Sequence, residues 1–241
     1  MAQRKLKYKR VLLKLTGDLF GNKNGKGINF ESFDEISKNL IKVCKQTKVE
    51  LAIVVGGGNI FRGRERAIHF DEPTADYMGM LATVINGMAL QEAFERQGMP
   101  TRMMTAFEIQ AVAEPYIRRR AIRHLEKGRV VIFTAGIGSP FFTTDTGAAL
   151  RATEINCDVL IKATNVDGIY SSDPLKNGDA KLHKKLNYNE VIKKELQVMD
   201  TAAFTLCRKH KIPIIVFNIK RLNDLAKIIK GSKIGTIVCE D

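Results

Sequence analysis

Short apolar runs alternate with longer segments in which apolar residues recur at helical spacing. The runs predict strands at residues 11–13, 51–55, 101–105, 130–133, 158–161, 213–217 and 236–239. The longer segments predict helices at residues 30–45, 73–97, 116–127, 146–155, 189–196, 200–209 and 222–230. Strands that alternate with helices favour a mainly parallel sheet covered on both faces. We therefore expect one α/β domain over the 241 residues.

Two local patterns add detail to this prediction. In the first helix, Ser32 and Glu35 have the spacing of a capping box, which is typical of a helix start. Residues 175–187 are mostly polar, so we predict a polar connection between elements there.

The composition is that of an ordinary globular protein, with 44% apolar and 27% charged residues. No apolar run is long enough to span a bilayer, so we expect no membrane segment. The four cysteines are scattered and form no CxxC pair, which argues against a zinc site or a disulfide framework. A reducing cytoplasm fits this cysteine usage best.

The formal net charge of +13 has two interpretations. Basic domains neutralise the phosphates of nucleic acids, but a lysine-rich solvated surface gives the same count. The chain has no tryptophan, and aromatic residues do not interleave with basic clusters such as residues 118–123. We therefore expect nucleic acid not to be a main partner, and small phosphorylated molecules remain compatible with the charge.

The strongest candidate for chemistry is residues 135–145, which follow a predicted strand and precede a predicted helix. The segment contains two glycines, the neighbouring hydroxyls of Thr143 and Thr144, and then Asp145. This order brings unpaired backbone N–H groups and a helix N-terminus to one point, which attracts an anion. Asp145 could hold a metal or orient a cation. The alternative is a tight turn in which Thr143 or Thr144 caps the helix.

Three other turns follow predicted strands. Lys14 ends the first strand, where its ammonium group can reach a phosphate. Residues 56–59 place three glycines after the second strand, and residues 164–173 combine turn formers with an aromatic residue and acids, which suits an adenine–ribose clamp. Each can be a plain turn by itself. Because parallel strands end at one edge of the sheet, four such turns together favour an enzyme that handles phosphates.

Five motifs together resemble the bacterial uridylate kinases of the amino acid kinase family. They are Lys14-Leu-Thr-Gly17, Gly56-Gly-Gly-Asn59 with Arg62, Asp76-Tyr-Met-Gly-Met-Leu-Ala-Thr83, Pro140-Phe-Phe-Thr-Thr-Asp145 and Lys162-Ala-Thr-Asn-Val-Asp-Gly168, and Val198-Met-Asp200 follows near the C-terminus. The resemblance covers nearly the whole chain. It implies a three-layer αβα sandwich, a homohexamer, and transfer of the ATP γ-phosphate to UMP, which gives UDP and ADP in pyrimidine nucleotide biosynthesis.

The resemblance also implies where each substrate binds within the single domain of residues 1–241. Acceptor and phosphate loops would lie mainly in residues 10–157, and the ATP nucleoside site mainly in residues 158–241. The residues implied at ATP are Lys14, Leu15, Thr16, Gly17, Gly58, Arg62, Thr164, Asn165, Tyr170 and Asp173. Those implied at UMP are Gly57, Asp76, Ile137, Gly138, Ser139, Pro140, Phe141, Phe142, Thr143 and Thr144.

Three of these positions depart from the family pattern. Thr16 replaces the usual serine and keeps a hydroxyl, whereas Ile137 and Ser139 replace the more usual threonine and asparagine. A side-chain contact to UMP can therefore be lost there while the backbone donors remain.

For catalysis, the resemblance implies Lys14, Asp145 and Arg62. The acceptor is a phosphate oxygen, which is largely ionised near neutrality because the second pKa of a phosphomonoester is about 6, so no general base is needed. Accordingly, all four histidines lie outside these loops. Lys14 would stabilise charge on the moving phosphoryl group, and Asp145 would orient Lys14 or metal-bound water. Mg²⁺ would be carried mainly by the ATP phosphates rather than by a protein metal site.

The resemblance further implies allosteric regulation by nucleotides. A site that accepts UMP and has room for ATP phosphates should admit UTP, so we expect UTP to inhibit. Many family members are activated by GTP between subunits. Arg102 and Arg129 occupy expected basic positions, but Gln91 and Glu95 stand where more cations are expected. A glutamate repels a triphosphate by roughly 0.5–1 kcal/mol, so we predict weak or no GTP activation.

Two other function classes remain open. An acetylglutamate or aspartate kinase would share the ATP half but should lack the motifs at residues 76–80 and 141–144. A nucleotide-binding regulator without enzymatic activity would keep the loops and show no turnover. A coupled assay with ATP, Mg²⁺ and a panel of acceptors separates these classes.

Overall fold

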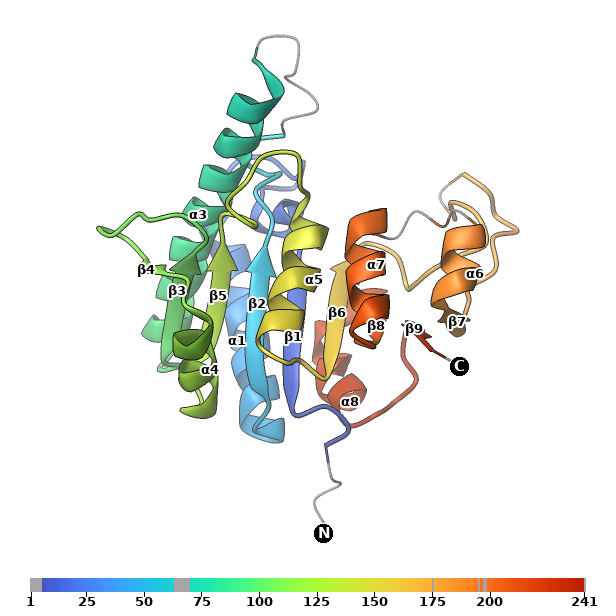
Figure 1. The fold of residues 1–241 in the computed structure, drawn as a ribbon. Coiled ribbons are helices and arrows are strands. Elements are labelled where there is room, and N and C mark those ends of the chain that lie inside the picture. The colour runs from blue at the N-terminus through green and yellow to red at the C-terminus, as the bar shows by residue number, and fades with distance from the viewer. Residues whose placement is uncertain (1–5, 63–69, 175, 195, 197–198, 241) are drawn as a thin grey trace.

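The computed structural model describes residues 6–62, 70–174, 176–194, 196 and 199–240. Its centre is a nine-stranded sheet with the order β4-β3-β5-β2-β1-β6-β8-β9-β7 (Figure 1). Neighbouring strands are parallel except for the antiparallel pair β8 and β9. The strands are β1 Arg10–Leu15, β2 Glu50–Val55, β3 Thr101–Thr105, β4 Glu114–Pro115, β5 Val130–Thr134, β6 Val159–Thr164, β7 Lys185–Asn187, β8 Ile214–Asn218 and β9 Thr236–Cys239.

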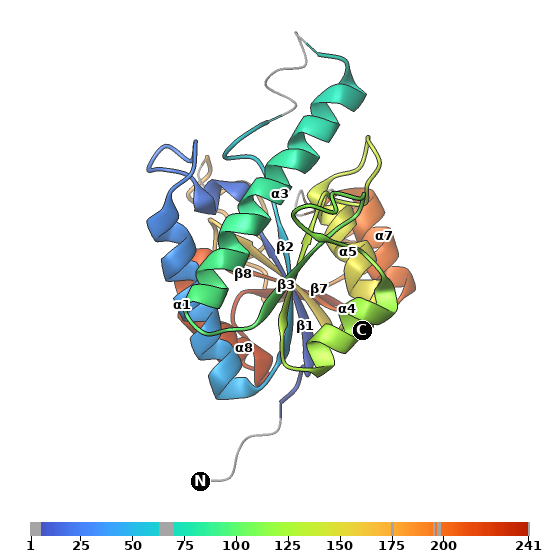
Figure 2. The same cartoon turned by 90° about the vertical axis from the view of Figure 1, so that its left-hand side faces the viewer.

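Helices cover both faces of this sheet, which makes the three-layer α/β architecture expected from the sequence. The helices are η1 Gly17–Phe20, α1 Phe30–Thr47, α3 Glu72–Arg96, α4 Arg118–Glu126, α5 Thr144–Glu154, α6 Tyr188–Lys193, α7 Thr201–Lys209, η2 Ile219–Asp224 and α8 Leu225–Ile229. Figure 2 shows α1, α3 and α8 on one side of the sheet, and α4, α5 and α7 on the other.

The central strands bury both of their faces, which explains why they appear in the sequence as continuous apolar runs. In β1, Leu13 packs into the core under α1 and α3, while Leu12 packs into the core under α4 and α5. Successive side chains of a strand point to opposite faces, so one run supplies both cores. This burial fixes the sheet and therefore the positions of the loops at its edge.

The seven predicted strands and the predicted helices are present, with boundaries shifted by a few residues. Two short strands were not predicted. The prediction of a polar connection at residues 175–187 is wrong in part, because β7 occupies its end and Leu182 forms a β-bridge with Tyr170. These short strands pair at the margins of the sheet, and so few residues give no periodic signal.

The capping box predicted at Ser32 and Glu35 is also wrong. Asn29 is the N-cap of α1, and its side chain accepts a hydrogen bond from the Glu31 N–H at 3.0 Å. A complete capping box exists instead at α6, where Asn187 and Glu190 each accept from the other's backbone N–H at 2.8 Å. Capping-box spacing occurs by chance in polar helix starts, and the cap is decided by where the extended backbone ends.

Candidate active site

Three charged side chains form the centre of the site at the carboxyl edge of the sheet. Lys14 in β1 and Lys162 in β6 lie side by side, because these adjacent strands pair the two residues in register. Asp145, in the first turn of α5, reaches both of them. Its Oδ1 lies 3.1 Å from Lys14 Nζ, and its Oδ2 lies 2.6 Å from Lys162 Nζ. We call these three residues the lysine–aspartate cluster.

Burial and charge act in opposite directions on the Asp145 carboxyl. Its burial raises the pKa, but the neighbouring ammonium groups of Lys14 and Lys162 outweigh that effect and hold the pKa below its usual value of 3.8. The pKa of Lys162 lies below its usual 10.5, because burial disfavours the ammonium form and Asp145 offsets this only in part. Two ammonium groups facing one carboxylate leave a surplus positive charge, which a phosphate can neutralise.

The start of α5 is fixed by hydroxyl groups. Thr143 is the N-cap of α5, and its Oγ1 accepts hydrogen bonds from the N–H groups of Asp145 at 3.1 Å and Thr146 at 3.3 Å. The same Thr143 hydroxyl donates to Asp200 Oδ2, which also accepts from Thr146 Oγ1 at 2.9 Å. Asp200 in turn caps α7. The capped-turn interpretation of this segment is therefore correct, and the cap brings Asp145 to the two lysines.

The turns after β1 and β2 touch each other closely. A Cβ added to Gly17 would lie 2.4 Å from the Gly58 nitrogen, so only glycine fits at position 17. Arg62 spans the two turns. Its Nε donates to the Gly58 carbonyl at 3.0 Å, and its Nη2 lies 2.5 Å from Asp18 Oδ1. Of the predicted phosphate contacts, Gly17, Gly58 and Arg62 thus lie on neighbouring turns, and Lys14 lies in β1 just before the first of them.

A cavity of about 300 Å³ opens beside these turns. The predicted acceptor residues Gly57, Asp76, Phe142, Thr143 and Thr144 line it, together with Gly58, Phe61, Ala75, Gly79, Met80, Thr83 and Gly136. The other predicted acceptor residues, 137–141, are not part of this lining. Helix α3, the glycine turn and the start of α5 therefore surround one space.

The backbone next to this cavity is held in an unusual conformation. Phe141 has a φ of 71° and Ala135 a φ of 61°, which is strained for residues other than glycine. Asp76 Oδ2 accepts from the Phe141 N–H at 2.7 Å, and Thr83 Oγ1 accepts from the Ala135 N–H at 2.7 Å. Two side chains of α3 thus hold the strained loop, and strain of this kind is concentrated at functional sites.

A second cavity, of about 520 Å³, lies beside the loop after β6. The predicted residues Tyr170 and Asp173 line it, with Lys176, Lys194 and several apolar groups. Thr164 and Asn165 lie outside this lining. Thr164 Oγ1 instead donates to the Val166 carbonyl at 2.8 Å, which shapes the start of the loop.

Several residues of the site were not given a role by the sequence. Lys162 and Asp200 stand inside recognised motifs, so motif membership was the signal that could have found them. Asp18, the partner of Arg62, carries no such signal. Asn86 is an amide among the mostly apolar buried residues of α3, which indicates a buried polar contact. Val198, in the motif near the C-terminus, and His69, one of the four histidines, lie outside the described residues.

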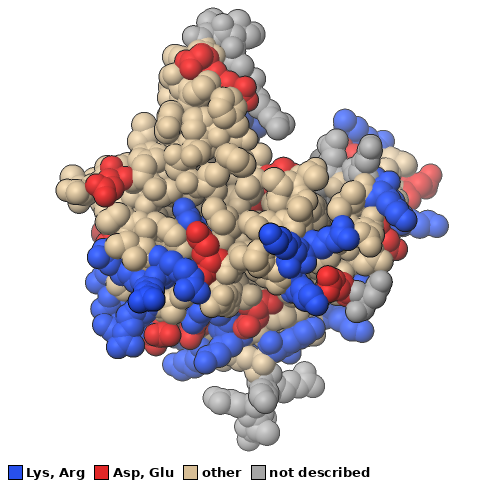
Figure 3. Space-filling model, in the orientation of Figure 1, with Lys and Arg blue, Asp and Glu red and all other residues tan. Residues whose placement is uncertain are grey.

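The charge distribution is uneven over the face that Figure 3 shows. Lysine and arginine gather on its lower half, over the arginine-rich helix α4, while the upper end of α3 shows mainly uncharged and acidic groups. Within the described ranges, no group of three or more His, Cys, Asp or Glu side chains could hold a metal ion. None of the helices described here is long and apolar enough to cross a membrane.

A mostly parallel sheet with anion-attracting turns and surplus positive charge at its carboxyl edge defines an α/β enzyme of the phosphate-handling class. The comparisons with known proteins make this specific. The model of the amino acid kinase family matches residues 9–218, and the chain belongs to this family.

Relatives and solved structures resemble the chain over nearly its full length. A uridylate kinase of Deinococcus radiodurans is 53% identical over 232 residues, which cover 96% of this chain and 95% of that protein. A uridylate kinase of Methylococcus capsulatus is 51% identical over 232 residues, which cover 96% of this chain and 97% of that protein. The crystal structure of UMP kinase from Bacillus anthracis superposes with a TM-score of 0.93 at 40% identity, with 97% of each chain covered.

Proposed function

We propose that this protein is a nucleoside monophosphate kinase that transfers the γ-phosphate of ATP to UMP and gives UDP and ADP. The observation that carries the proposal is the full-length similarity, at 51–53% identity, to proteins named uridylate kinase. The site agrees with it, because phosphoryl transfer depends on positioning and charge neutralisation rather than on a general base. This activity belongs to pyrimidine nucleotide biosynthesis.

The donor site would combine the turns after β1 and β2 with the loop after β6. Lys14, Leu15, Thr16, Gly17, Gly58 and Arg62 would meet the ATP phosphates. Thr164, Asn165, Tyr170 and Asp173 would form the nucleoside part of the site. The support is the cavity of about 520 Å³ that Tyr170 and Asp173 line in the C-terminal half of the sheet.

The acceptor site would be the cavity between α3 and the start of α5. Gly57, Asp76, Phe142, Thr143 and Thr144 would contact UMP directly, and residues 137–141 would close over it. Asp76 already accepts from the Phe141 N–H, so this carboxylate would link a ribose hydroxyl to the loop that covers the base. That coupling would let the loop distinguish one nucleobase from another.

In catalysis, Lys14 would stabilise negative charge on the phosphoryl group as it moves, with Lys162 and Arg62 in support. Asp145 would hold the two lysines in place, because its two oxygens already contact one ammonium group each. A carboxylate with a lowered pKa and two cationic partners is a poor proton acceptor, so its role is geometric.

Magnesium would enter with ATP. The carboxylate oxygens of Asp145 face ammonium groups, so this cluster does not offer the oxygen-rich ligand set that Mg²⁺ requires. When bound on the ATP phosphates, the ion supplies charge neutralisation to the transferred group. The protein's own contribution is then the placement of Lys14, Lys162 and the glycine turns.

A hexameric assembly is part of the proposal and has a candidate contact surface. Tyr77, Leu81, Ile85 and Met88 lie on one face of α3 and are 43–47% exposed. Apolar side chains at helical spacing on an exposed face are typical of a protein–protein contact. A cytoplasmic location is also proposed, from the free state of Cys44, Cys157, Cys207 and Cys239.

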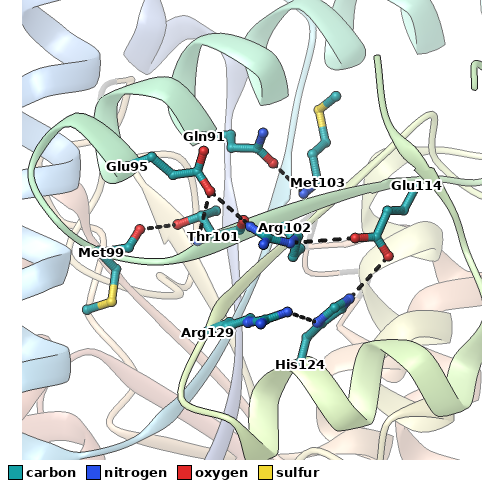
Figure 4. Close-up of polar contacts among 9 residues, drawn as sticks. All are labelled: Gln91, Glu95, Met99, Thr101, Arg102, Met103, Glu114, His124 and Arg129. Carbon is teal, nitrogen blue, oxygen red and sulfur yellow. Dashed lines mark hydrogen bonds and ion pairs between the residues drawn. The ribbon is translucent and has the colours of Figure 1, made fainter. Parts of the chain in front are cut away.

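Inhibition by UTP and a weak or absent response to GTP complete the proposal. Figure 4 shows the region that the sequence analysis assigned to GTP. Arg102 pairs with Glu95 at 3.0 Å and with Glu114 at 3.6 Å, and Arg129 contacts His124 Nδ1 at 3.0 Å. Gln91 accepts from the Met103 N–H at 2.7 Å. Both arginines thus have partners within the chain, which would have to be displaced before a triphosphate could bind.

The test is a coupled assay with ATP, Mg²⁺ and a panel of acceptors that contains UMP, CMP, acetylglutamate and aspartate. We expect turnover with UMP and a kcat/KM at least about tenfold lower with CMP, because base recognition of this kind is worth more than about 1.4 kcal/mol. Comparable values for UMP and CMP would refute the uridylate assignment. Turnover with an amino acid alone would indicate the other branch of the family, and no turnover with any acceptor would indicate a binding protein.

A further inference from the structure

Two buried asparagines connect the glycine turn after β2 with helix α3. Asn59 follows the three glycines and is 3% exposed, and Asn86 lies in the middle of α3 and is 0% exposed. Their amides bond to each other twice. Asn59 Nδ2 donates to Asn86 Oδ1 at 3.1 Å, and Asn86 Nδ2 donates to Asn59 Oδ1 at 2.7 Å. We call these residues the asparagine pair.

The remaining amide hydrogens of the pair reach the backbone of two loops. Asn86 Nδ2 donates to the Gly56 carbonyl at 2.8 Å, and Asn59 Nδ2 donates to the Gly27 carbonyl at 2.8 Å. The Gly27 N–H donates back to the Asn59 carbonyl at 2.8 Å. All four N–H donors and both side-chain oxygens of the pair are therefore used, although the site is fully buried.

The bond to Gly56 has a consequence for the next peptide. No peptide bond in the described chain is cis, so the Gly57 N–H points opposite to the Gly56 carbonyl. Because Asn86 draws that carbonyl toward α3, the Gly57 N–H points away from Asn86. Among the described residues, the N–H groups of Gly57 and Gly58 have no hydrogen-bond partner. Two unpaired donors follow each other in a turn that lines the acceptor cavity.

We propose that Asn86 and Asn59 are positioning residues for phosphoryl transfer, which hold the N–H groups of Gly57 and Gly58 in the orientation that meets the phosphates. This inference rests on the proposed role of residues 57 and 58 as phosphate contacts. Neither asparagine touches a substrate. Both act through the glycine turn, because Asn86 fixes its first carbonyl and Asn59 ties it to the neighbouring loop at Gly27.

An amide is the side chain that this arrangement requires. Leucine has as many side-chain heavy atoms as asparagine and branches at the same carbon, but it has no donor, so Asn86→Leu would keep the site filled and free the Gly56 carbonyl. Small misplacements of catalytic donors cost more in the transition state than in substrate binding. We therefore expect kcat of Asn86→Leu to fall about 100-fold, while the KM values for ATP and UMP change less than about threefold.

The matched control is a polar contact between α1 and the C-terminal end of α3, far from the turns. Ser37 of α1 is 0% exposed, and its hydroxyl accepts from Gln97 Nε2 at 2.6 Å. Ser37→Ala should lower the melting temperature without changing kcat by more than about twofold, because it removes only this contact and the hydrogen bond from Ser37 Oγ to the Asp34 carbonyl at 3.1 Å. The loss of kcat in Asn86→Leu is thereby separated from a loss of stability.

Gly58→Ala tests the underlying assignment. A Cβ at position 58 has no atom closer than 3.6 Å, so the variant should fold, and the methyl group would obstruct a phosphate at this turn. If Gly58→Ala is impaired but folded Asn86→Leu keeps a kcat within twofold of wild type, the asparagine proposal is overturned and the phosphate role of the turn stands. Unimpaired Gly58→Ala removes the phosphate role of the turn, and the asparagine proposal falls with it.

A second variant keeps the proposal testable if Asn86→Leu does not fold. Asn59→Asp retains an oxygen for the Asn86 amide and lets Asn86 hold Gly56, but it loses the donors to Gly27 and to Asn86. We expect a kcat loss of about tenfold, smaller than for Asn86→Leu, because the turn loses its tie to Gly27 while Asn86 still holds Gly56. If Asn86→Leu does not fold and folded Asn59→Asp has the kcat of wild type, the proposal is overturned.

Discussion

Two charged clusters of this protein have similar components and opposite properties. The lysine–aspartate cluster sets two ammonium groups against one carboxylate, with side chains only 11–14% exposed. The cluster around Arg102 sets Arg102, Arg120 and Arg129 against Glu95 and Glu114, with His124 between Glu114 and Arg129. The first has surplus positive charge in a sheltered place. In the second, each carboxylate is paired with an arginine, and the Arg102–Glu95 contact is more than one-third exposed.

The difference shows what prepares a cluster to bind an anion. In a sheltered place the field of an unbalanced charge is weakly screened, so a phosphate that arrives completes the charge balance. In an exposed cluster whose carboxylates are paired with arginines, an anion must first displace those carboxylates, and water screens the attraction that it gains. Residue types alone do not distinguish the two cases. The following predictions test this comparison.

The largest effect is expected for Lys14→Ala. Removal of the ammonium group takes away charge stabilisation of the transferred phosphoryl group, and we expect kcat to fall about 1000-fold. The coupled ATP–UMP assay measures it, with thermal unfolding as a check on the fold. Lys9→Ala, at an exposed lysine near the other end of β1, is the control and should keep wild-type turnover. Near-normal turnover of Lys14→Ala would remove this lysine from the mechanism.

Next is the stability of Asp145→Asn. This variant leaves two sheltered ammonium groups without their carboxylate, and we expect a loss of about 3–5 kcal/mol in the free energy of unfolding by urea at pH 7. The pKa of Asp145 is lowered in the folded protein, so its contribution is complete above pH 3.8 and is lost as the pH falls through the folded-state pKa. The difference between wild type and variant should therefore shrink below pH 3.8. A difference that does not depend on pH would contradict the pairing.

A much smaller effect is expected for Glu95→Gln in the exposed cluster around Arg102. The Arg102–Glu95 contact is more than one-third exposed on both sides, and such pairs contribute about 0.2–1 kcal/mol to stability. Urea unfolding at low and high salt measures the loss, which should decrease as salt increases. A loss as large as that of Asp145→Asn would show that exposure is not what separates the two clusters.

The smallest effect is the expected response of the wild type to GTP. At sub-saturating UMP, GTP should change the rate less than about twofold, because the two arginines already have intrachain partners. UTP should inhibit in the same assay, and its inhibition serves as the positive control for nucleotide binding. A several-fold stimulation by GTP would show that Glu95 and Gln91 do not prevent effector binding.

By itself, the sequence determined the layered α/β fold, because the apolar runs and the helical periodicity record burial directly. It also determined the loops that carry the candidate site, because parallel strands place their carboxyl ends at one edge. The sequence did not predict the cap of α1, because a cap depends on the local backbone conformation. It also did not predict the two short strands at the margins of the sheet, because a strand of two or three residues shows no periodicity of apolar positions.

Only the tertiary structure decided which polar residues meet. Lys14 and Lys162 are 148 positions apart in numbering and become neighbours through the β1–β6 register, and Asp145 joins them from the start of α5. The pairing of Asn59 with Asn86 likewise depends on how α3 packs on the sheet. Periodicity records how deeply each residue is buried. It does not record the distance between two side chains, which register and helix packing set.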